Sequence, residues 1–168
     1  YTGIFTMLAI VGAGLVGFLD DWIKIRNERN LGLSKRAKSV GLLVVACGFP
    51  ALMLGFSDET GQHTTLSFTR FDSPGFDLGT VGWFLLAALT IVAVTNAVNL
   101  TDGMDGLAGG SAIFAFAAFV VIGFWAFRHP TIYETPHALD LAVIAAAMLG
   151  ACTGFLWWNA APARIFMG

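Results

Sequence analysis

Long apolar runs separated by short polar segments dominate the sequence. At 1.5 Å per helical residue each run reaches about 25–33 Å, enough to cross the hydrocarbon core of a bilayer with some tilt. The pattern therefore predicts an all-α fold, a polytopic transmembrane helix bundle with about five spans in a single domain over residues 1–168. The predicted spans are 3–19, 40–56, 78–98, 106–127 and 138–158.

The composition agrees with a chain surrounded by lipid. Hydrophobic residues make up 57% of the chain and charged residues 12%, with a mean hydropathy of +0.75. A soluble domain needs more polar surface than this composition supplies, so we expect a lipid bilayer around the chain and no nucleic-acid partner. Neither end resembles a natural terminus, and we expect the sequence to be an internal fragment of a longer membrane protein.

The distribution of positive charge predicts which connections face the cytoplasm. Seven of the nine Lys and Arg residues lie in segments 20–39 and 159–168. By the positive-inside rule, these segments and 99–105 are cytoplasmic, while 57–77 and 128–137 face outward. Residues 64–69 alternate polar and apolar side chains before a Pro-Gly pair, which favours a short hairpin in the outer connection.

A pair of acids, Asp20 and Asp21, closes the first apolar run. Adjacent carboxylates repel each other unless a metal ion or a cation such as Lys24 compensates them. Lys24 follows the pair by three and four residues, the spacing that brings side chains together on a helix. The pair is then either an interfacial charge at a helix end or part of a Mg²⁺-assisted phosphate site, since Mg²⁺ favours carboxylate and phosphate oxygens.

The basic segment 24–38 also permits two interpretations. It is a topogenic signal that binds anionic lipid headgroups, or it recognises a phosphorylated substrate. In the second interpretation Gly32 permits a turn, after which Arg36 and Lys38 point along one face.

The segment 96–110 is the most informative part of the chain. Asn and Asp recur every three residues, and glycines between them let the backbone approach a ligand. These Asn and Asp residues are Asn96, Asn99, Asp102 and Asp105. Polar groups at a membrane boundary are costly, which favours a functional role. The plainer alternatives are a turn in which Asp102 or Asp105 caps the next helix, and a glycosylation acceptor at Asn99, which the cytoplasmic placement disfavours.

Three segments, 17–24, 96–109 and 155–168, resemble in order and spacing the motifs of the phospho-N-acetylmuramoyl-pentapeptide-transferase family. This family is part of the polyprenyl-phosphate N-acetylhexosamine-1-phosphate transferases. The resemblance covers nearly the whole chain, and its most specific part is Asn-Leu-Thr-Asp-Gly-Met-Asp-Gly-Leu-Ala at 99–108.

The resemblance implies roles for individual residues. The catalytic positions it implies are Asp20, Asp21, Asp102, Lys24 and Asn99, and the substrate-binding positions are Lys38, Asp105, Asn159 and Phe166. Asp105 matches the position that recognises uracil, and Phe166 an aromatic residue beside the nucleotide. For Asn159 and Phe166, simple anchoring at the interface is the alternative.

The cofactor implied by the resemblance is Mg²⁺. The family's Mg²⁺ ligand is an Asp expected just after Gly168, and a His-rich motif is expected further on. Asp20, Asp21 or Asp102 would assist as metal ligands. We therefore expect the fragment alone to be inactive.

The reaction implied is transfer of phospho-MurNAc-pentapeptide from UDP-MurNAc-pentapeptide to undecaprenyl phosphate, giving lipid I and UMP. It would occur on the cytoplasmic face of the bacterial inner (plasma) membrane, in peptidoglycan biosynthesis and hence in cell-wall biogenesis, cell shape and cell division. Asp20 is our choice for the deprotonating residue, although direct attack and a covalent route both remain open. A homodimer is a further candidate assembly.

Two other functions compete with this one. A sister transferase would move another UDP-linked sugar phosphate, such as GlcNAc-1-phosphate, to a polyprenyl phosphate. A membrane transporter would place ionisable residues near the middle of its spans. The apolar runs contain almost none, which disfavours the transporter.

Overall fold

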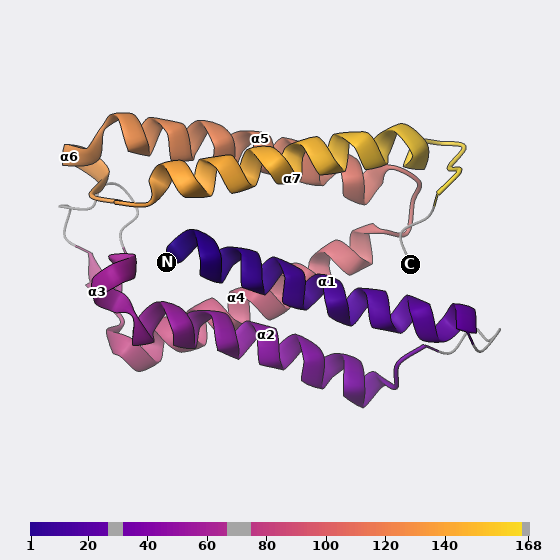
Figure 1. Ribbon diagram of the computed structural model, residues 1–168, viewed down its shortest axis with the longest axis horizontal. Coiled ribbons are helices and arrows are strands. Elements are labelled where there is room, and N and C mark those ends of the chain that lie inside the picture. The colour runs from indigo at the N-terminus through magenta and orange to yellow at the C-terminus, as the bar shows by residue number, and fades with distance from the viewer. Residues whose placement is uncertain (27–31, 67–74, 166–168) are drawn as a thin grey trace.

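The computed structural model describes residues 1–26, 32–66 and 75–165, and these residues are mainly helical (Figure 1). Five of the helices in these ranges are long and apolar enough to cross a membrane, which confirms the all-α, multi-span prediction. These helices are α1 (Thr2–Arg26), α2 (Lys35–Gly55), α4 (Gly79–Thr101), α5 (Leu107–Arg128) and α7 (Ala138–Asn159). Each contains most of one predicted span.

The long helices pack in two groups. In Figure 1, α5 and α7 lie side by side at the top, and α1, α2 and α4 form the group below them. Small residues stand at the contacts: a Cβ on Gly41 would lie 2.8 Å from Val16, and one on Gly123 would lie 3.0 Å from Ala142. Close backbone approach is the usual basis of helix association in lipid, where water does not drive packing.

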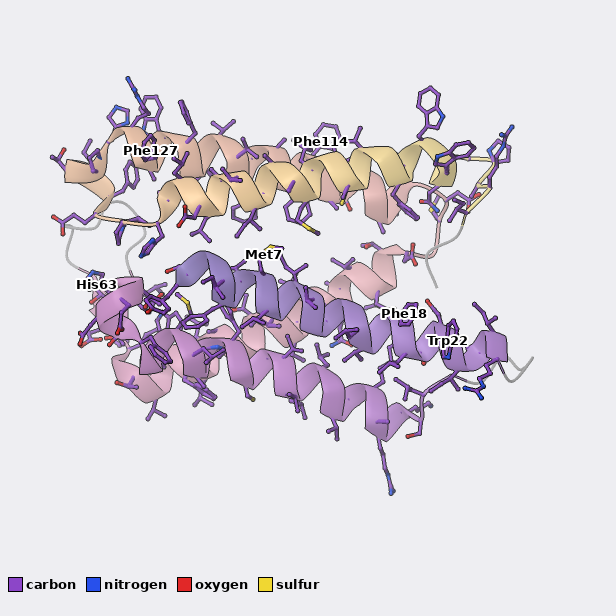
Figure 2. The ribbon with its side chains drawn as sticks, viewed as in Figure 1. Met7, Phe18, Trp22, His63, Phe114 and Phe127 are labelled. Atoms are coloured by element: carbon purple, nitrogen blue, oxygen red, sulfur yellow. The ribbon has the colours of Figure 1, made fainter. Side chains whose placement is uncertain are left out.

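Large apolar side chains cover the outside of the bundle. The Phe114 side chain on α5 (Figure 2) is 79% exposed and Trp157 on α7 is 81% exposed. A water-soluble protein would not leave so many large apolar groups uncovered. These surfaces fit a chain that has lipid or further helices around it.

One end of the bundle carries the short elements. Helices α3 (Ser57–Thr60) and α6 (Pro130–Tyr133) lie at the left of Figure 1, at what we call the hairpin end. There β1 (Thr65–Leu66) pairs antiparallel with β2 (Phe76–Asp77), which confirms the predicted hairpin over these residues. The rest of its predicted first strand, 67–69, lies outside the described residues.

Asp77 fastens this hairpin to α4. Its carboxylate accepts hydrogen bonds from the Gly79 N–H at 2.9 Å and from the Thr64 hydroxyl at 2.7 Å. These two donors hold the pKa of the Asp77 carboxyl below its usual range. The hairpin is therefore tied to the start of a long helix by an ionised side chain.

The opposite end, where α1, α4 and α7 finish and α2 and α5 begin, is called the basic end here. Helix α1 continues through Asp20 and Asp21 to Arg26, so both acids stand on a helix rather than in a loop. Helix α2 begins at Lys35 because the Ser34 hydroxyl accepts a bond from the Ala37 N–H at 3.2 Å. Among the described residues at this end, the buried polar side chains are Asp20 at 5% exposure and Asn159 at 4%.

Candidate active site at the basic end

Asp20 is the centre of the first group of polar residues at the basic end. One carboxylate oxygen, Oδ1, accepts a hydrogen bond from the Leu33 N–H at 2.8 Å. The other, Oδ2, lies 2.9 Å from Lys24 Nζ and 3.4 Å from Lys38 Nζ. Because a buried carboxylate is costly unless it is paired and hydrogen-bonded, these three donors are what keep Asp20 ionised in its buried position.

Asp21 joins this group through Lys24. The Lys24 ammonium contacts Asp21 Oδ1 at 2.9 Å as well as Asp20, so one cation compensates both acids. The pairing predicted from the spacing is confirmed, because the helix continues past Asp21 and brings residues three and four apart together. The side chain of Asp21 is 41% exposed and that of Lys24 is 32% exposed. The Asp20 cluster is defined as Asp20, Asp21, Lys24, Leu33 and Lys38.

The second group is built around Asn159, the last residue of α7. Its side-chain oxygen accepts a bond from the Gly106 N–H at 3.0 Å, and its amide nitrogen donates to the Ile165 carbonyl at 2.9 Å. Close by, Asp105 Oδ2 accepts a bond from the Ala163 N–H at 3.2 Å. The turn before α5 is therefore tied to the chain after α7. The Asn159 cluster is defined as Asp105, Gly106, Asn159, Ala163 and Ile165.

The α4–α5 turn differs from the capped turn considered as an alternative. Gly106, not Asp102 or Asp105, occupies the N-cap position of α5, so that alternative is wrong. Its φ of 77° lies in the left-handed region that glycine tolerates and other residues avoid. The acids on this turn are thus left available for other contacts.

The remaining predicted residues lie beside these clusters or beyond the described chain. Asn99 is exposed in the last turn of α4, and the half-buried Asp102 follows the end of that helix. In the sequence, both residues closely precede Asp105 of the Asn159 cluster. Phe166 lies outside the described residues. The structure brings four of the predicted residues into the Asp20 cluster and two, Asp105 and Asn159, into the other.

The acids of the described residues fit Mg²⁺ only as partners of a bound phosphate. Within 1–26, 32–66 and 75–165, no three His, Cys, Asp or Glu side chains gather closely enough to hold a metal ion. In proteins Mg²⁺ often takes one or two carboxylates and completes its shell with water and substrate phosphate. Asp20 is occupied by three donors, so the acids that suit such a ligand set, each taken singly, are the more exposed Asp21 and the half-buried Asp102.

The sequence interpretation missed the backbone groups that complete both clusters. The Leu33 N–H in the first and the Gly106 and Ala163 N–H groups in the second each bind a predicted side chain. Every residue other than proline carries the same N–H, so residue identity gives no signal for these bonds. Gly32 is interpreted from the sequence as permitting a turn, and close backbone approach is predicted only for the glycines of 96–110, which include Gly106.

Comparison with known proteins places the chain among transferases. The family model described as "Glycosyl transferase family 4" matches residues 3–168. The chain is 47% identical, over 99% of its length, to the phospho-N-acetylmuramoyl-pentapeptide-transferase of Saccharopolyspora erythraea and covers 49% of that protein. It is 46% identical over 99% of its length to the relative of that name from Frankia alni, covering 50% of it. For Streptomyces griseus the identity is 44% over the whole chain, covering 51%.

These matches confirm the resemblance found in the three sequence motifs. The chain spans about half the length of the curated relatives it matches. The matched range 3–168 includes all residues of both clusters. Since the family match extends over nearly every residue, this chain belongs to glycosyl transferase family 4.

Proposed function

We propose that the full-length protein, meaning a chain of the relatives' length that contains this sequence, transfers phospho-MurNAc-pentapeptide from UDP-MurNAc-pentapeptide to undecaprenyl phosphate. The products are lipid I and UMP. The relatives' shared name, phospho-N-acetylmuramoyl-pentapeptide-transferase, supports the transferred group. The observation that carries the proposal is the Asp20 cluster, where paired acids and two lysines meet at the end of membrane-spanning helices.

The position of this cluster suits a reaction between a soluble and a membrane-bound substrate. The donor is soluble in water, whereas the phosphate of the acceptor lies at the bilayer surface. A site at the helix ends lets both phosphates meet without bringing either charge into the hydrocarbon core. The reaction site is therefore expected at the basic end of the helices rather than partway along a membrane span.

We place the basic end on the cytoplasmic side of the bacterial inner membrane. Among the described residues, the Lys and Arg side chains at this end are Lys24, Arg26, Lys35, Arg36, Lys38 and Arg164. The hairpin end carries Arg128. This asymmetry supports the placement through the positive-inside rule. The UDP-linked donor is then supplied from the same side.

In the direct route an oxygen of the lipid phosphate attacks the donor phosphorus that bears the sugar. The bond from this phosphorus to the oxygen bridging to UMP breaks, and UMP leaves with the bonding electrons. Asp20 accepts the proton of the lipid phosphate when that phosphate is protonated. In the covalent route an Asp carboxylate attacks the same phosphorus first and expels UMP. An oxygen of the lipid phosphate then attacks that phosphorus, and the bond to the Asp carboxylate breaks.

The lysines supply the positive charge that two reacting anions require. Of the two lysines in the Asp20 cluster, Lys38 has the longer contact to Asp20 Oδ2, 3.4 Å, and the more exposed side chain, 50%, so it is the freer to turn toward a phosphate. Lys24 is held more closely by both acids. Fixed charges aimed at the developing negative charge are a large source of catalysis. Mg²⁺, when bound, would neutralise part of the diphosphate charge, with Asp21 or Asp102 as an oxygen ligand.

The two competing functions are less well supported. The relatives named above all carry the MurNAc-pentapeptide name rather than that of a sister transferase. In the five long helices, the Asp, Lys and Arg residues lie within about two turns of a helix end. A transporter that moves ions or polar substrates along these helices would need such residues near the middle.

A donor-competition assay tests the proposed function. The full-length protein is reconstituted in lipid with undecaprenyl phosphate and Mg²⁺, and release of UMP is measured with each donor. We expect UMP from UDP-MurNAc-pentapeptide and none from UDP-GlcNAc. Release from UDP-GlcNAc alone would instead establish the sister transferase, and release from neither donor would refute both enzyme functions.

A further inference from the structure

Gly32 lies directly against Asp20. A Cβ added to Gly32 would stand 2.7 Å from the Asp20 backbone oxygen, 2.9 Å from its Cγ, and would contact Oδ1 more closely still. The backbone oxygen belongs to helix α1 and cannot move aside as a flexible side chain would. Any side chain at position 32 would therefore push this part of the chain away from α1, and glycine is the residue that permits the approach.

This approach aligns the residues that follow Gly32. The next N–H, that of Leu33, donates to Asp20 Oδ1 at 2.8 Å. Ser34 then caps α2, and Lys38, in the first turns of that helix, reaches Asp20 Oδ2 at 3.4 Å. The two oxygens of one carboxylate thus receive a backbone donor and a lysine from a single stretch of seven residues.

We propose that Gly32 is a positioning residue of the phosphate-transfer site: its missing side chain lets residues 32–38 dock on Asp20 and holds Asp20 and Lys38 in register. The inference rests on the proposed function for the meaning of that site. Gly32 touches no substrate and acts through Asp20 alone. Its role is the close contact with Asp20, which a Cβ at position 32 would prevent.

Gly17 provides a matched control three residues before Asp20 on α1. A Cβ on Gly17 would meet nothing within 4 Å, so Gly17→Ala changes the same residue type near the same site without a clash. Leu33→Pro provides a second variant, because proline removes the N–H that Asp20 accepts and adds no atom at position 32.

The first measurement is amide hydrogen exchange of the full-length protein in lipid. Gly32→Ala is expected to speed exchange at the Leu33 amide about tenfold, since the bond to Asp20 protects it, while exchange in α5 and α7 stays as in wild type. In an Asp20→Ala background, Gly32→Ala should add nothing further, because the accepting carboxylate is already gone. Further speeding of exchange at the Leu33 amide in that background would mean that the methyl group acts by another route than the bond to Asp20, and would overturn the proposal.

The second measurement is the transfer rate per folded molecule with UDP-MurNAc-pentapeptide. Displacement of the lysine and the carboxylate by about an ångström is expected to lower kcat about 10- to 100-fold in Gly32→Ala, and similarly in Leu33→Pro, with Gly17→Ala near wild type. Faster exchange at Leu33 with an unchanged kcat would overturn the positioning role. If wild type transferred no donor, the proposed function would fail, while the exchange data would still decide whether Gly32 docks the segment on Asp20.

Discussion

The two clusters at the basic end are held together by different forces. In the Asp20 cluster, a carboxylate of 5% exposure is stabilised by two lysines that remain partly exposed. In the Asn159 cluster, the neutral side-chain amide of Asn159, which is 4% exposed, accepts a bond from the Gly106 N–H and donates one to the Ile165 carbonyl. The first cluster carries charge that can respond to a bound phosphate, whereas the second fixes the shape of the chain. Apart from Asp105, the charged side chains belong to the first cluster and the framework contacts to the second.

This division predicts different results for mutation in the two clusters. Changing a charge in the Asp20 cluster should alter the reaction more than the stability of the fold. A change in the Asn159 cluster should mainly lower the stability of the fold. It should slow the reaction only indirectly, because the acids of the α4–α5 turn are displaced.

Asp20→Asn is expected to have the largest effect. The amide keeps the size of the side chain but cannot accept a proton in the same way and no longer attracts Lys24 and Lys38. Loss of a catalytic base usually costs about 10²- to 10⁴-fold in rate. The measurement is lipid I synthesis by the full-length protein, with Asp140→Asn at the exposed hairpin end as control. Near-normal synthesis by Asp20→Asn would show that Asp20 is not the deprotonating residue.

Asn159→Ala is expected to destabilise the fold by about 1–3 kcal/mol, because it leaves the Gly106 N–H and the Ile165 carbonyl without their partner. Denaturant unfolding of the full-length protein in detergent measures the change. Asn96→Ala is the matched control, since Asn96 is exposed and donates to the Val92 carbonyl of its own helix. Equal losses of stability in the two variants would argue against a framework role for Asn159.

Gly106→Ala is expected to cost about 1–2 kcal/mol of unfolding free energy. The new Cβ would be held at a φ of 77° and would stand 3.3 Å from Leu156. Gly103→Ala, in the same turn, meets its nearest heavy atom, the Leu100 carbonyl oxygen, only at 3.9 Å. The same unfolding experiment compares the two variants, and a Gly103→Ala loss as large as that of Gly106→Ala would contradict the assignment.

Lys24→Met is expected to cost about 1 kcal/mol of stability: removing one cation beside the buried Asp20 is unfavourable, but Lys24 is itself partly exposed, and Lys38 and the Leu33 N–H still pair with that carboxylate. The loss should shrink as salt rises, since salt screens exposed ion pairs. Unfolding measured at low and high salt tests this. The control is Lys35→Met, at an exposed position at the start of α2. A loss that does not change with salt would mean that packing of the lysine stem, not its charge, matters.

The sequence was sufficient for the membrane helices and for part of the site. Apolar runs longer than a bilayer core predict spans directly, and all five predicted spans correspond to long helices. The pairing of Lys24 with both acids followed from helical spacing alone. These features depend on neighbours in the sequence, which is why they could be predicted.

The contacts between distant segments could not be predicted in this way. Lys38 meets Asp20 across 18 residues, and Gly106 meets Asn159 across 53. Such contacts depend on how the helices pack and on backbone groups that carry no residue signature. The cap of α5 also differed from the alternative considered, because a glycine with positive φ took the place that an Asp side chain would have filled.

The central claim is that both clusters serve one phosphate-transfer site at the membrane surface. An experimental structure of the full-length protein with bound UDP tests it most directly. We predict the diphosphate within hydrogen-bonding distance of Lys24 or Lys38 and the uracil beside Asp105. A nucleotide bound away from both clusters, or an Asp20 cluster facing lipid, would contradict the account.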